Sequence, residues 1–304
     1  MRLKGITLAK KFIYNQKVAP YVFVAPFVVT FLLFFLYPVI SSVIMTFQNI
    51  LPGDVTFIGL ENYNRLNDPL FFKALGLNVR YTLWTLAILI PLPMMLAIFL
   101  NSKNMRARNF YRSTLFIPAL TSVVVAGTIF RLIFGELPGA LMNRLISLLG
   151  AKPIKWLRVQ EMSMITMLML ATWRWTGVNI LYFLAGLQNI PNELYEAADI
   201  DGASPWQVFR RIIIPMLKPV TIYVVTISIY GGMAMFTESY MLWAGNRSPN
   251  NIGLTIVGYL YRKGFEENNM GYGSTIGITL LVIVMLVNLL QLYVNGFFKK
   301  EKSL

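Results

Sequence analysis

The sequence predicts an all-α, polytopic membrane protein with six transmembrane helices, and three observations support this fold class. Hydrophobic residues make up 56% of the 304 residues, charged residues 13%, and the mean hydropathy is +0.60. A soluble core cannot hide that much apolar surface. Most of the charge-poor runs reach the roughly 20 residues that a helix needs to cross a bilayer. The runs are continuous rather than alternating, which excludes a β-barrel and leaves helices.

The predicted spans cover residues 20–47, 80–102, 113–134, 162–187, 217–240 and 272–298. They form one transmembrane domain over residues 19–298, with a segment 1–18 before it and a tail 299–304 after it. The first span follows a basic segment, as a signal peptide does, but it is longer than a typical h-region of about 7–15 residues. We therefore expect it to be a permanent helix.

Lysine and arginine are concentrated in the segments that alternate to one side of the membrane. The basic residues of the two ends and of the second-to-third connection are Arg2, Lys4, Lys10, Lys11, Lys17, Lys103, Arg106, Arg108, Arg112, Lys299, Lys300 and Lys302. Cytoplasmic segments carry such an excess, so both termini and loop 188–216 are expected in the cytoplasm of a cell membrane protein. The third-to-fourth loop, with Arg144, Lys152, Lys155 and Arg158, weakens this asymmetry without reversing it.

Loop 188–216 begins with a predicted short helix. Asn192 is a suitable N-cap for a helix over residues 193–200, and acidic residues in its first turn complement the helix dipole. Ala197 and Ala198 keep the helix slim, and Glu196 offers a carboxylate to a basic group of a partner. These features predict a docking helix on the cytoplasmic side. An amphipathic interfacial helix rich in acids is the alternative if the spacing of the residues is ignored.

A second short helix is predicted after a turn at Gly202. Ser204 can cap it, with Pro205 at the first helical position and Gln207 three residues after the cap, which is the pattern of a capping box. We expect this helix to end at Pro215. The loop is thus a predicted helix-turn-helix, and two capped helices around a tight turn make a stiff element.

The same loop carries a motif that resembles a known signature. It contains Glu-Ala-Ala-Asp-Ile-Asp-Gly over residues 196–202, followed after nine residues by Ile-Ile-Ile-Pro over residues 212–215. This resembles the signature loop of permease subunits of ABC importers, with Ile214 in place of the usual leucine. Residues 57–63, 116–122, 173–177 and 187–191 resemble the carbohydrate branch with the maltose and glycerol-phosphate permeases. Residues 51–53, 181–203, 238–240 and 251–255 most resemble arabinooligosaccharide permease subunits of Gram-positive bacteria. Residues 244–249 depart from the glycine-rich segment of many relatives.

The resemblance implies a fold, a function and a set of partners. The fold is the ABC-importer permease fold, with a cytoplasmic coupling helix-turn-helix. The function is to form half of the translocation pathway of an ATP-driven, binding-protein-dependent importer of oligosaccharides. The implied partners are a second homologous permease, two cytoplasmic ATPase subunits and an extracytoplasmic solute-binding protein. The residues expected to couple to the ATPase are Glu196, Ala197, Ala198, Asp199, Gly202, Ile212 and Pro215.

Several catalytic chemistries are excluded by what the sequence lacks. There is no phosphate-binding GxxxxGK[ST] segment, so ATP and magnesium are expected to be used by the partner ATPase. The chain has no histidine and no cysteine, and no paired carboxylates within the spans. We therefore expect a transport subunit without catalytic residues, bound metal or cofactor.

Polar residues inside the spans mark the expected substrate pathway, because charge in a bilayer is costly and usually faces a cavity. Sugars bind through hydroxyls hydrogen-bonded to planar polar groups and through ring faces stacked on aromatic rings. The expected pathway residues are Trp173, Arg174, Trp175, Asn179, Phe236, Glu238, Tyr240 and Trp243. Anchoring of Trp and Tyr at the membrane interface, with arginines that reach the headgroups, is the alternative, and it is favoured for Arg131.

The sequence favours an importer over other functions. The net charge of +14 follows the topology rather than forming a stripe beside aromatic residues, which argues against nucleic-acid binding. An ion-coupled secondary transporter would not need the signature loop. Within the importer reading, a maltooligosaccharide, another oligosaccharide or glycerol phosphate is the alternative substrate.

Overall fold

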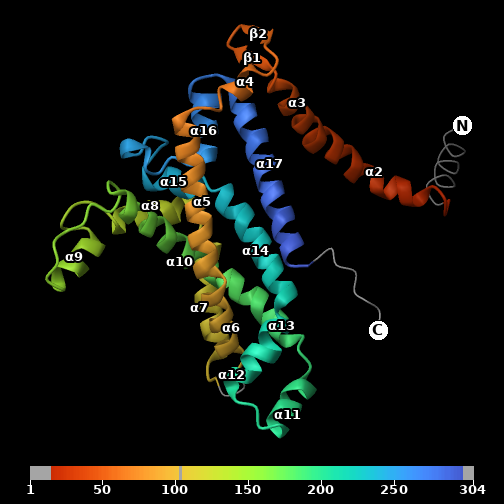
Figure 1. Cartoon of the computed structure of the whole chain (residues 1–304), viewed down its shortest axis with the longest axis vertical. Helices are drawn as coiled ribbons and strands as arrows, with labels where there is room; N and C mark the ends of the chain where they lie inside the picture. The colour runs from red at the N-terminus through yellow and green to blue at the C-terminus, as the bar shows by residue number, and fades with distance from the viewer. Residues whose placement is uncertain (1–14, 103–104, 297–304) are drawn as a thin grey trace, which may run out of the picture. The chain divides into compact units, whose positions relative to one another are not determined.

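A computed structural model describes residues 15–102 and 105–296 of the chain (Figure 1). It consists of two compact units, Met1–Leu66 with Lys263–Ile278, and Asn67–Arg262 with Thr279–Leu304. We describe each unit by itself. Several of the basic residues that predict the orientation lie outside the described residues: Arg2, Lys4, Lys10, Lys11, Lys103, Lys299, Lys300 and Lys302.

The first unit begins with one long helix of three segments. These are α2 (Ala19–Phe31), the π-helical turn η1 (Leu32–Leu36) and α3 (Tyr37–Met45). The wide turn η1 precedes Pro38, whose ring would clash with a carbonyl of a regular helix and which lacks an N–H to donate. None of these residues is buried within the chain.

A small hairpin follows this helix. Strands β1 (Gln48–Leu51) and β2 (Asp54–Phe57) pair antiparallel, and Gly53 takes a positive φ of 83° in the turn between them. The short helix α4 (Glu61–Asn64) comes next. Its buried Asn62 donates from Nδ2 to the carbonyls of Thr46, at 3.1 Å, and Gln48, at 2.9 Å, and so fixes the hairpin to the end of α3.

The second unit opens with two helices in line, α5 (Pro69–Leu89) and α6 (Pro91–Asn101). The Asp68 side chain caps α5 by accepting from the N–H of Leu70 at 2.8 Å. The helix breaks at Ile90, because Pro91 and Pro93 cannot donate to the preceding turn. This pair begins eleven residues before the predicted span 80–102.

The predicted span 113–134 is not one helix. It consists of α7 (Arg108–Leu120) and α8 (Val123–Ile133), which are bent by 95°. The break falls at Thr121 and Ser122, whose backbone is extended or nearly so, with ψ of 131° and 135°. The short helix α9 (Leu141–Leu148) follows.

Helix α10 (Gln160–Gln188) is the longest helix of the second unit, with 29 residues, and it packs against α5, α6 and α7. Two buried clusters lie along it. One joins its first half to α5 and α8, and the other joins its second half to α6 and α14.

The remaining elements follow α10 in order. They are α11 (Asn192–Ile200), α12 (Pro205–Val208), η2 (Phe209–Ile213), α13 (Ile214–Met216), α14 (Lys218–Met233), α15 (Thr237–Leu242), η3 (Pro249–Asn251), α16 (Ile256–Tyr261), η4 (Arg262–Glu266) and α17 (Met270–Val294). The last two continue from one unit into the other. The predicted span 217–240 ends early, because α14 stops at Met233 and a break separates it from α15.

Three helices within residues 15–102 and 105–296 are long and apolar enough to cross a membrane, namely 19–45, 69–101 and 270–294. Two bent pairs, α7 with α8 and the helix 205–216 with α14, raise the number to five if each is one crossing. Helix α10 is long enough but less apolar. The number of six spans therefore stays a prediction, which depends on α10 being a crossing with a polar side.

Candidate functional site

The first candidate site is the loop between α10 and α14, whose turn is fixed by local hydrogen bonds. Gly202 takes a φ of +68°, which L-residues with side chains rarely adopt. The N–H groups of Gly202 and Ala203 donate to the carbonyls of Asp199, at 3.1 Å, and Ala198, at 2.9 Å, and so close the end of α11. The predicted turn at Gly202 is confirmed.

The helix after this turn begins with the predicted capping box. The N–H of Gln207 donates to Oγ of Ser204 at 3.4 Å, and the N–H of Ser204 donates to Oε1 of Gln207 at 2.6 Å. Pro205 occupies the first helical position. These local contacts set the start of the helix without help from the rest of the chain.

Two predictions about this loop are wrong. Asn192 does not cap α11, because Pro191 has an extended backbone, with ψ of 136°, and the helix already begins at Asn192. Pro215 does not end the second helix. The π turn η2 before it absorbs the missing N–H, and the 64° bend comes after Met216.

The coupling residues predicted from the sequence lie on different sides of the loop. Glu196, Ala197, Asp199, Gly202 and Pro215 are exposed, Ile212 is half-buried, and Ala198 is buried. Glu196 and Asp199 line a cavity of about 370 Å³, with Asn101, Ser102, Asn192 and Tyr195 among its other walls. Within the described part of the chain, neither carboxylate forms an ion pair. Burial raises the pKa of the Tyr195 phenol above its ordinary value.

Sequence reasoning missed two apolar side chains on this loop. Ile200 is 87% exposed and Trp206 is 65% exposed, and they stand on either side of the turn at Gly202. Together these two side chains give the turn an exposed apolar surface. The apolar residue inside an acidic helix was the available signal.

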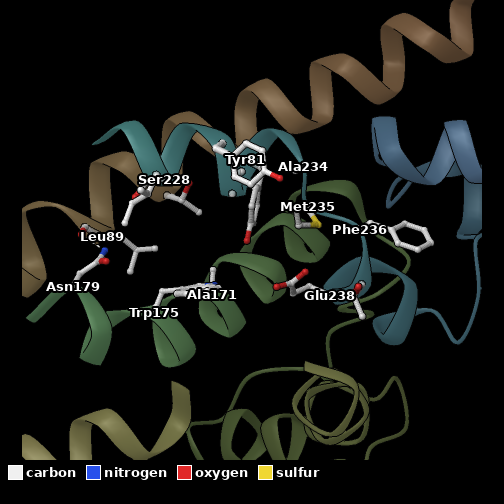
Figure 2. Close-up of a pocket in the computed structure, with 16 residues that line it drawn as sticks. Tyr81, Leu89, Ala171, Trp175, Asn179, Ser228, Ala234, Met235, Phe236 and Glu238 are labelled. Carbon is white, nitrogen blue, oxygen red and sulfur yellow. Dashed lines mark hydrogen bonds between the residues drawn. The ribbon is translucent and has the colours of Figure 1, made fainter. Parts of the chain in front are cut away.

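The second candidate site is a cavity of about 470 Å³ inside the second unit (Figure 2). Its walls come from α5, α10, α14, α15 and the break between α14 and α15. Figure 2 shows Ala171, Trp175 and Asn179 in a row along α10, with Met235 and Phe236 from the break and Glu238 from α15. Of the predicted pathway residues, the cavity brings together Trp175, Asn179, Phe236 and Glu238.

One carboxylate of this cavity is held by an arginine behind the wall. Nη1 of Arg174 lies 3.3 Å from Oε1 of Glu238, and the two side chains are only 13% and 17% exposed. The guanidinium of Arg174 also lies over the ring of Trp175, 5.3 Å from its centroid. Arg174 therefore orients two cavity residues, one on its own helix and one on α15.

Asn179 has a structural partner as well as a place in the wall. Its Nδ2 donates to the carbonyl of Leu89 at 2.9 Å. In a regular helix that carbonyl would accept from the residue four positions later, which here is Pro93 and has no N–H. Asn179 thus satisfies a carbonyl that the α5–α6 break leaves without a backbone partner.

The other predicted pathway residues do not line this cavity. Trp173 packs against Phe130, with ring centroids 5.6 Å apart, and Trp243 donates from Nε1 to the carbonyl of Leu157 at 2.9 Å. Tyr240 packs between Phe236 and Tyr261. Arg131 lies half-buried in the last turn of α8.

Sequence reasoning missed the contribution of α5. Tyr81 and Thr85 line the cavity, and buried Asn78 holds the break opposite them. Nδ2 of Asn78 donates to the carbonyls of Gly232, at 2.8 Å, and Met233, at 3.1 Å, where α14 ends. A Cβ at Gly232 would overlap Thr82, so this close approach needs a glycine. The polar stripe of Asn78, Thr82 and Thr85 at helical spacing was the available signal.

Metal chemistry finds no support in the described residues. They contain no cluster of three or more His, Cys, Asp or Glu side chains that could hold an ion. The cavity offers instead a carboxylate, an amide, hydroxyls and aromatic rings.

The sequence is similar to proteins of known families over nearly its whole length. Residues 89–300 match the family described as binding-protein-dependent transport system inner membrane component. The chain is 59% identical over 288 residues to an arabinooligosaccharides transport system permease protein of Bacillus subtilis (strain 168), covering 95% of this chain and 92% of that protein. It is 49% identical over 289 residues to the protein of the same name in Halalkalibacterium halodurans, covering 95% and 91%.

Solved structures share the fold. A chain of a bacterial ABC transporter involved in the import of the acidic polysaccharide alginate superposes with a TM-score of 0.82 and 20% identity, over 99% of this chain and 100% of that chain. At this identity the likeness concerns the fold alone, and it confirms the predicted permease fold. The chain belongs to the family of inner membrane components of binding-protein-dependent transport systems, and it is a multi-pass, non-catalytic permease subunit.

Proposed function

We propose that this chain is the permease subunit of an ATP-driven importer that carries arabinooligosaccharides across the cell membrane. The observation that carries the proposal is the 59% identity over 95% of the chain to a permease protein named for these sugars. At this identity the residues that line a transport pathway are expected to be largely retained. The cavity chemistry supports a neutral sugar, because its carboxylate is paired and its other polar groups are uncharged.

The cavity is the proposed sugar site. Trp175 and Phe236 offer aromatic faces for the apolar side of a sugar ring, and Tyr81, Thr85 and Glu238 offer groups that hydrogen-bond to hydroxyls. Arg174 pairs with the Glu238 carboxylate and holds it in place, so that its oxygens can accept hydrogen bonds from the sugar. Trp173, Tyr240 and Trp243 support the walls rather than contact the sugar.

The partners complete the proposed importer. A second homologous permease forms the other half of the pathway, two cytoplasmic ATPase subunits use ATP and magnesium, and a solute-binding protein delivers the sugar. The turn at Gly202 docks on an ATPase, with Ile200 and Trp206 as apolar contacts and Glu196 and Asp199 as acceptors for basic groups. This arrangement requires loop 188–216 and both termini to be cytoplasmic.

Two neighbouring tryptophans of α10 provide the test of the sugar site. Uptake of labelled arabinooligosaccharides is measured in cells that carry Trp175→Ala or the matched control Trp173→Ala, with unlabelled maltooligosaccharides as competitor. Loss of a stacking partner is expected to weaken apparent affinity roughly tenfold, about 1.4 kcal/mol, for Trp175→Ala only. Equal effects of the two substitutions would remove the cavity from the pathway. Efficient competition by maltooligosaccharides would refute the proposed substrate and leave the family assignment intact.

A further inference from the structure

Helix α9 lies between α8 and α10 and is held in one orientation. Its buried Asn143 donates from Nδ2 to the carbonyls of Gly135 and Ile154, both at 3.2 Å. Oδ1 of Asn143 accepts from the N–H of Ile154 and from Nε1 of Trp156, both at 3.0 Å. Met142 and Ile146, on the same side, pack against the buried cluster of α8 and α10. The opposite face of α9 is therefore fixed outward.

That outward face is a stripe of leucines. Leu141, Leu145 and Leu148 are spaced by four and three residues, which places them on one side of a helix with 3.6 residues per turn. All three are exposed, Leu148 by 82%, and Leu149 at the end of the helix is 87% exposed. We call these four residues the leucine stripe. No described residue of the chain covers the leucine stripe, whereas the opposite face of α9 packs against the buried cluster.

The stripe continues the apolar outer surface of α8. Val125, Ile129 and Leu132 of α8 are exposed, as is Leu137 in the connection to α9. Helix α8 belongs to one of the bent pairs that are apolar enough to cross a membrane. Figure 1 shows α9 beyond α8, on the side away from α5. Exposed apolar side chains thus occur on α8, in the connection and on the leucine stripe.

The charges around the stripe have one sign. Arg144, Lys152 and Lys155 are exposed, and residues 137–157 contain no Asp or Glu. Within the described residues none of the three forms an ion pair, whereas Arg158 is paired with Glu136 at 2.7 Å. On the helical wheel Arg144 lies beside Leu148, at the border of the stripe. Long basic side chains at such a border place their stems along apolar surface and their charges in a polar layer.

We propose that α9 lies in the interfacial layer of the bilayer, with the leucine stripe among the acyl chains and Arg144, Lys152 and Lys155 at the phosphates of anionic lipids. Apolar residues on one face and basic residues at its border are the features of an interfacial helix. Because Asn143 fixes α9 to the connections that join it to α8 and α10, this contact holds the end of α8 at the membrane surface. The inference does not depend on which sugar is carried.

Spin labels test this placement directly, because the chain has no native cysteine. Single variants Leu145→Cys and Leu148→Cys carry a nitroxide, and Ser147→Cys on the same helix but off the stripe is the matched control. Variants that retain uptake in cells are assembled with cysteine-free partner subunits in nanodiscs that contain phosphatidylglycerol. Collision with oxygen, which concentrates in lipid, is compared with collision with a water-soluble nickel chelate.

Labels at residues 145 and 148 are expected to favour oxygen over the nickel chelate, and the label at residue 147 is expected to show the reverse order. Preference for the chelate at all three positions would place α9 in water and overturn the proposal. Immobile labels shielded from both reagents at residues 145 and 148 would overturn it in favour of a protein partner. Shielding only after a solute-binding protein is added would contradict it too, and would identify that protein as the occupant.

Discussion

Arg174 and Glu238 are the residues on which the cavity most depends. Both are largely shielded from water, and each is the only charged partner that the described residues give the other. Removing one member leaves a shielded charge without compensation, whereas removing both does not. The pair should therefore act as one unit in stability and in transport.

A double-mutant cycle tests this coupling. Arg174→Gln and Glu238→Gln should each destabilise the assembly by about 1–3 kcal/mol, and the double variant should recover more than half of the summed loss. The measurement is thermal unfolding of the nanodisc-embedded assembly. The control is the exposed pair of Arg158 and Glu136, for which the same cycle should give about 0–1 kcal/mol. Simple additivity at Arg174 and Glu238 would contradict the account.

The residues of the coupling loop were easier to predict than those of the cavity, for a physical reason. The capping box of Ser204 and Gln207 and the positive φ of Gly202 depend on neighbours within four residues, and these neighbours are visible in the sequence. Tyr81 and Asn78 act on segments about 150 residues away, and only the packing of α5 on α14 brings them there. Trp243 likewise donates to the distant carbonyl of Leu157 and does not line the cavity.

At the scale of elements, the breaks in the helices decide the shape of the cavity. The α5–α6 break exposes the carbonyl of Leu89, and the end of α14 exposes those of Gly232 and Met233. The side-chain amide of Asn179 donates to the first carbonyl, and that of Asn78 donates to the other two. The sequence marks these two breaks with Pro91, Pro93 and Gly232. It did not predict the 95° bend between α7 and α8, because no single residue type marks it.

At the α5–α6 break, we expect the loss of stability from a substitution at Asn179 to be rescued by a substitution at Pro93. Asn179→Leu removes the donor to the Leu89 carbonyl and should destabilise the assembly by about 1–3 kcal/mol. Pro93→Ala supplies an N–H four residues after Leu89, so the double variant should regain much of that stability. Thermal unfolding in nanodiscs measures all three variants. No recovery in the double variant would mean that the amide acts through something other than this carbonyl.

Two substitutions of similar size at Gly202 separate the effect of backbone conformation on uptake from the effect of charge. A Cβ at Gly202 meets no atom within 4 Å, so a substitution there acts through the backbone and through its own charge. Asn adopts positive φ more readily than other residues, so Gly202→Asn should retain most uptake. Gly202→Asp places a carboxylate between the apolar contacts Ile200 and Trp206, where docking would remove it from water without a partner, and uptake should be lost.

Membrane levels of both Gly202 variants should equal those of the parent chain, measured by quantitative immunoblot beside the uptake assay. Equal uptake by the Asn and Asp variants would argue against docking at this turn. Loss of membrane insertion in both would instead indicate a role in folding.

At the scale of the whole molecule, the chain combines a helical membrane domain with a proposed coupling loop, and its sequence has no phosphate-binding GxxxxGK[ST] segment. Composition alone predicted the membrane domain, because apolar runs of this length have no other solvent than lipid. It did not predict the polarity of α10, since a helix that lines a pathway loses the uniform apolarity by which spans are recognised. Membrane insertion favours an apolar α10, whereas a transport pathway needs polar side chains on it.

We propose that this chain forms half of the pathway and that ATP acts on it through a partner at the coupling loop. The most direct measurement is accumulation of labelled arabinooligosaccharide in proteoliposomes that contain the chain with its partner permease, ATPase subunits and solute-binding protein. We predict accumulation that requires ATP and every subunit, that is abolished by Glu196→Lys without loss of assembly, and no ATP turnover by the isolated chain. Accumulation without the ATPase subunits, or undiminished accumulation with Glu196→Lys, would contradict the account.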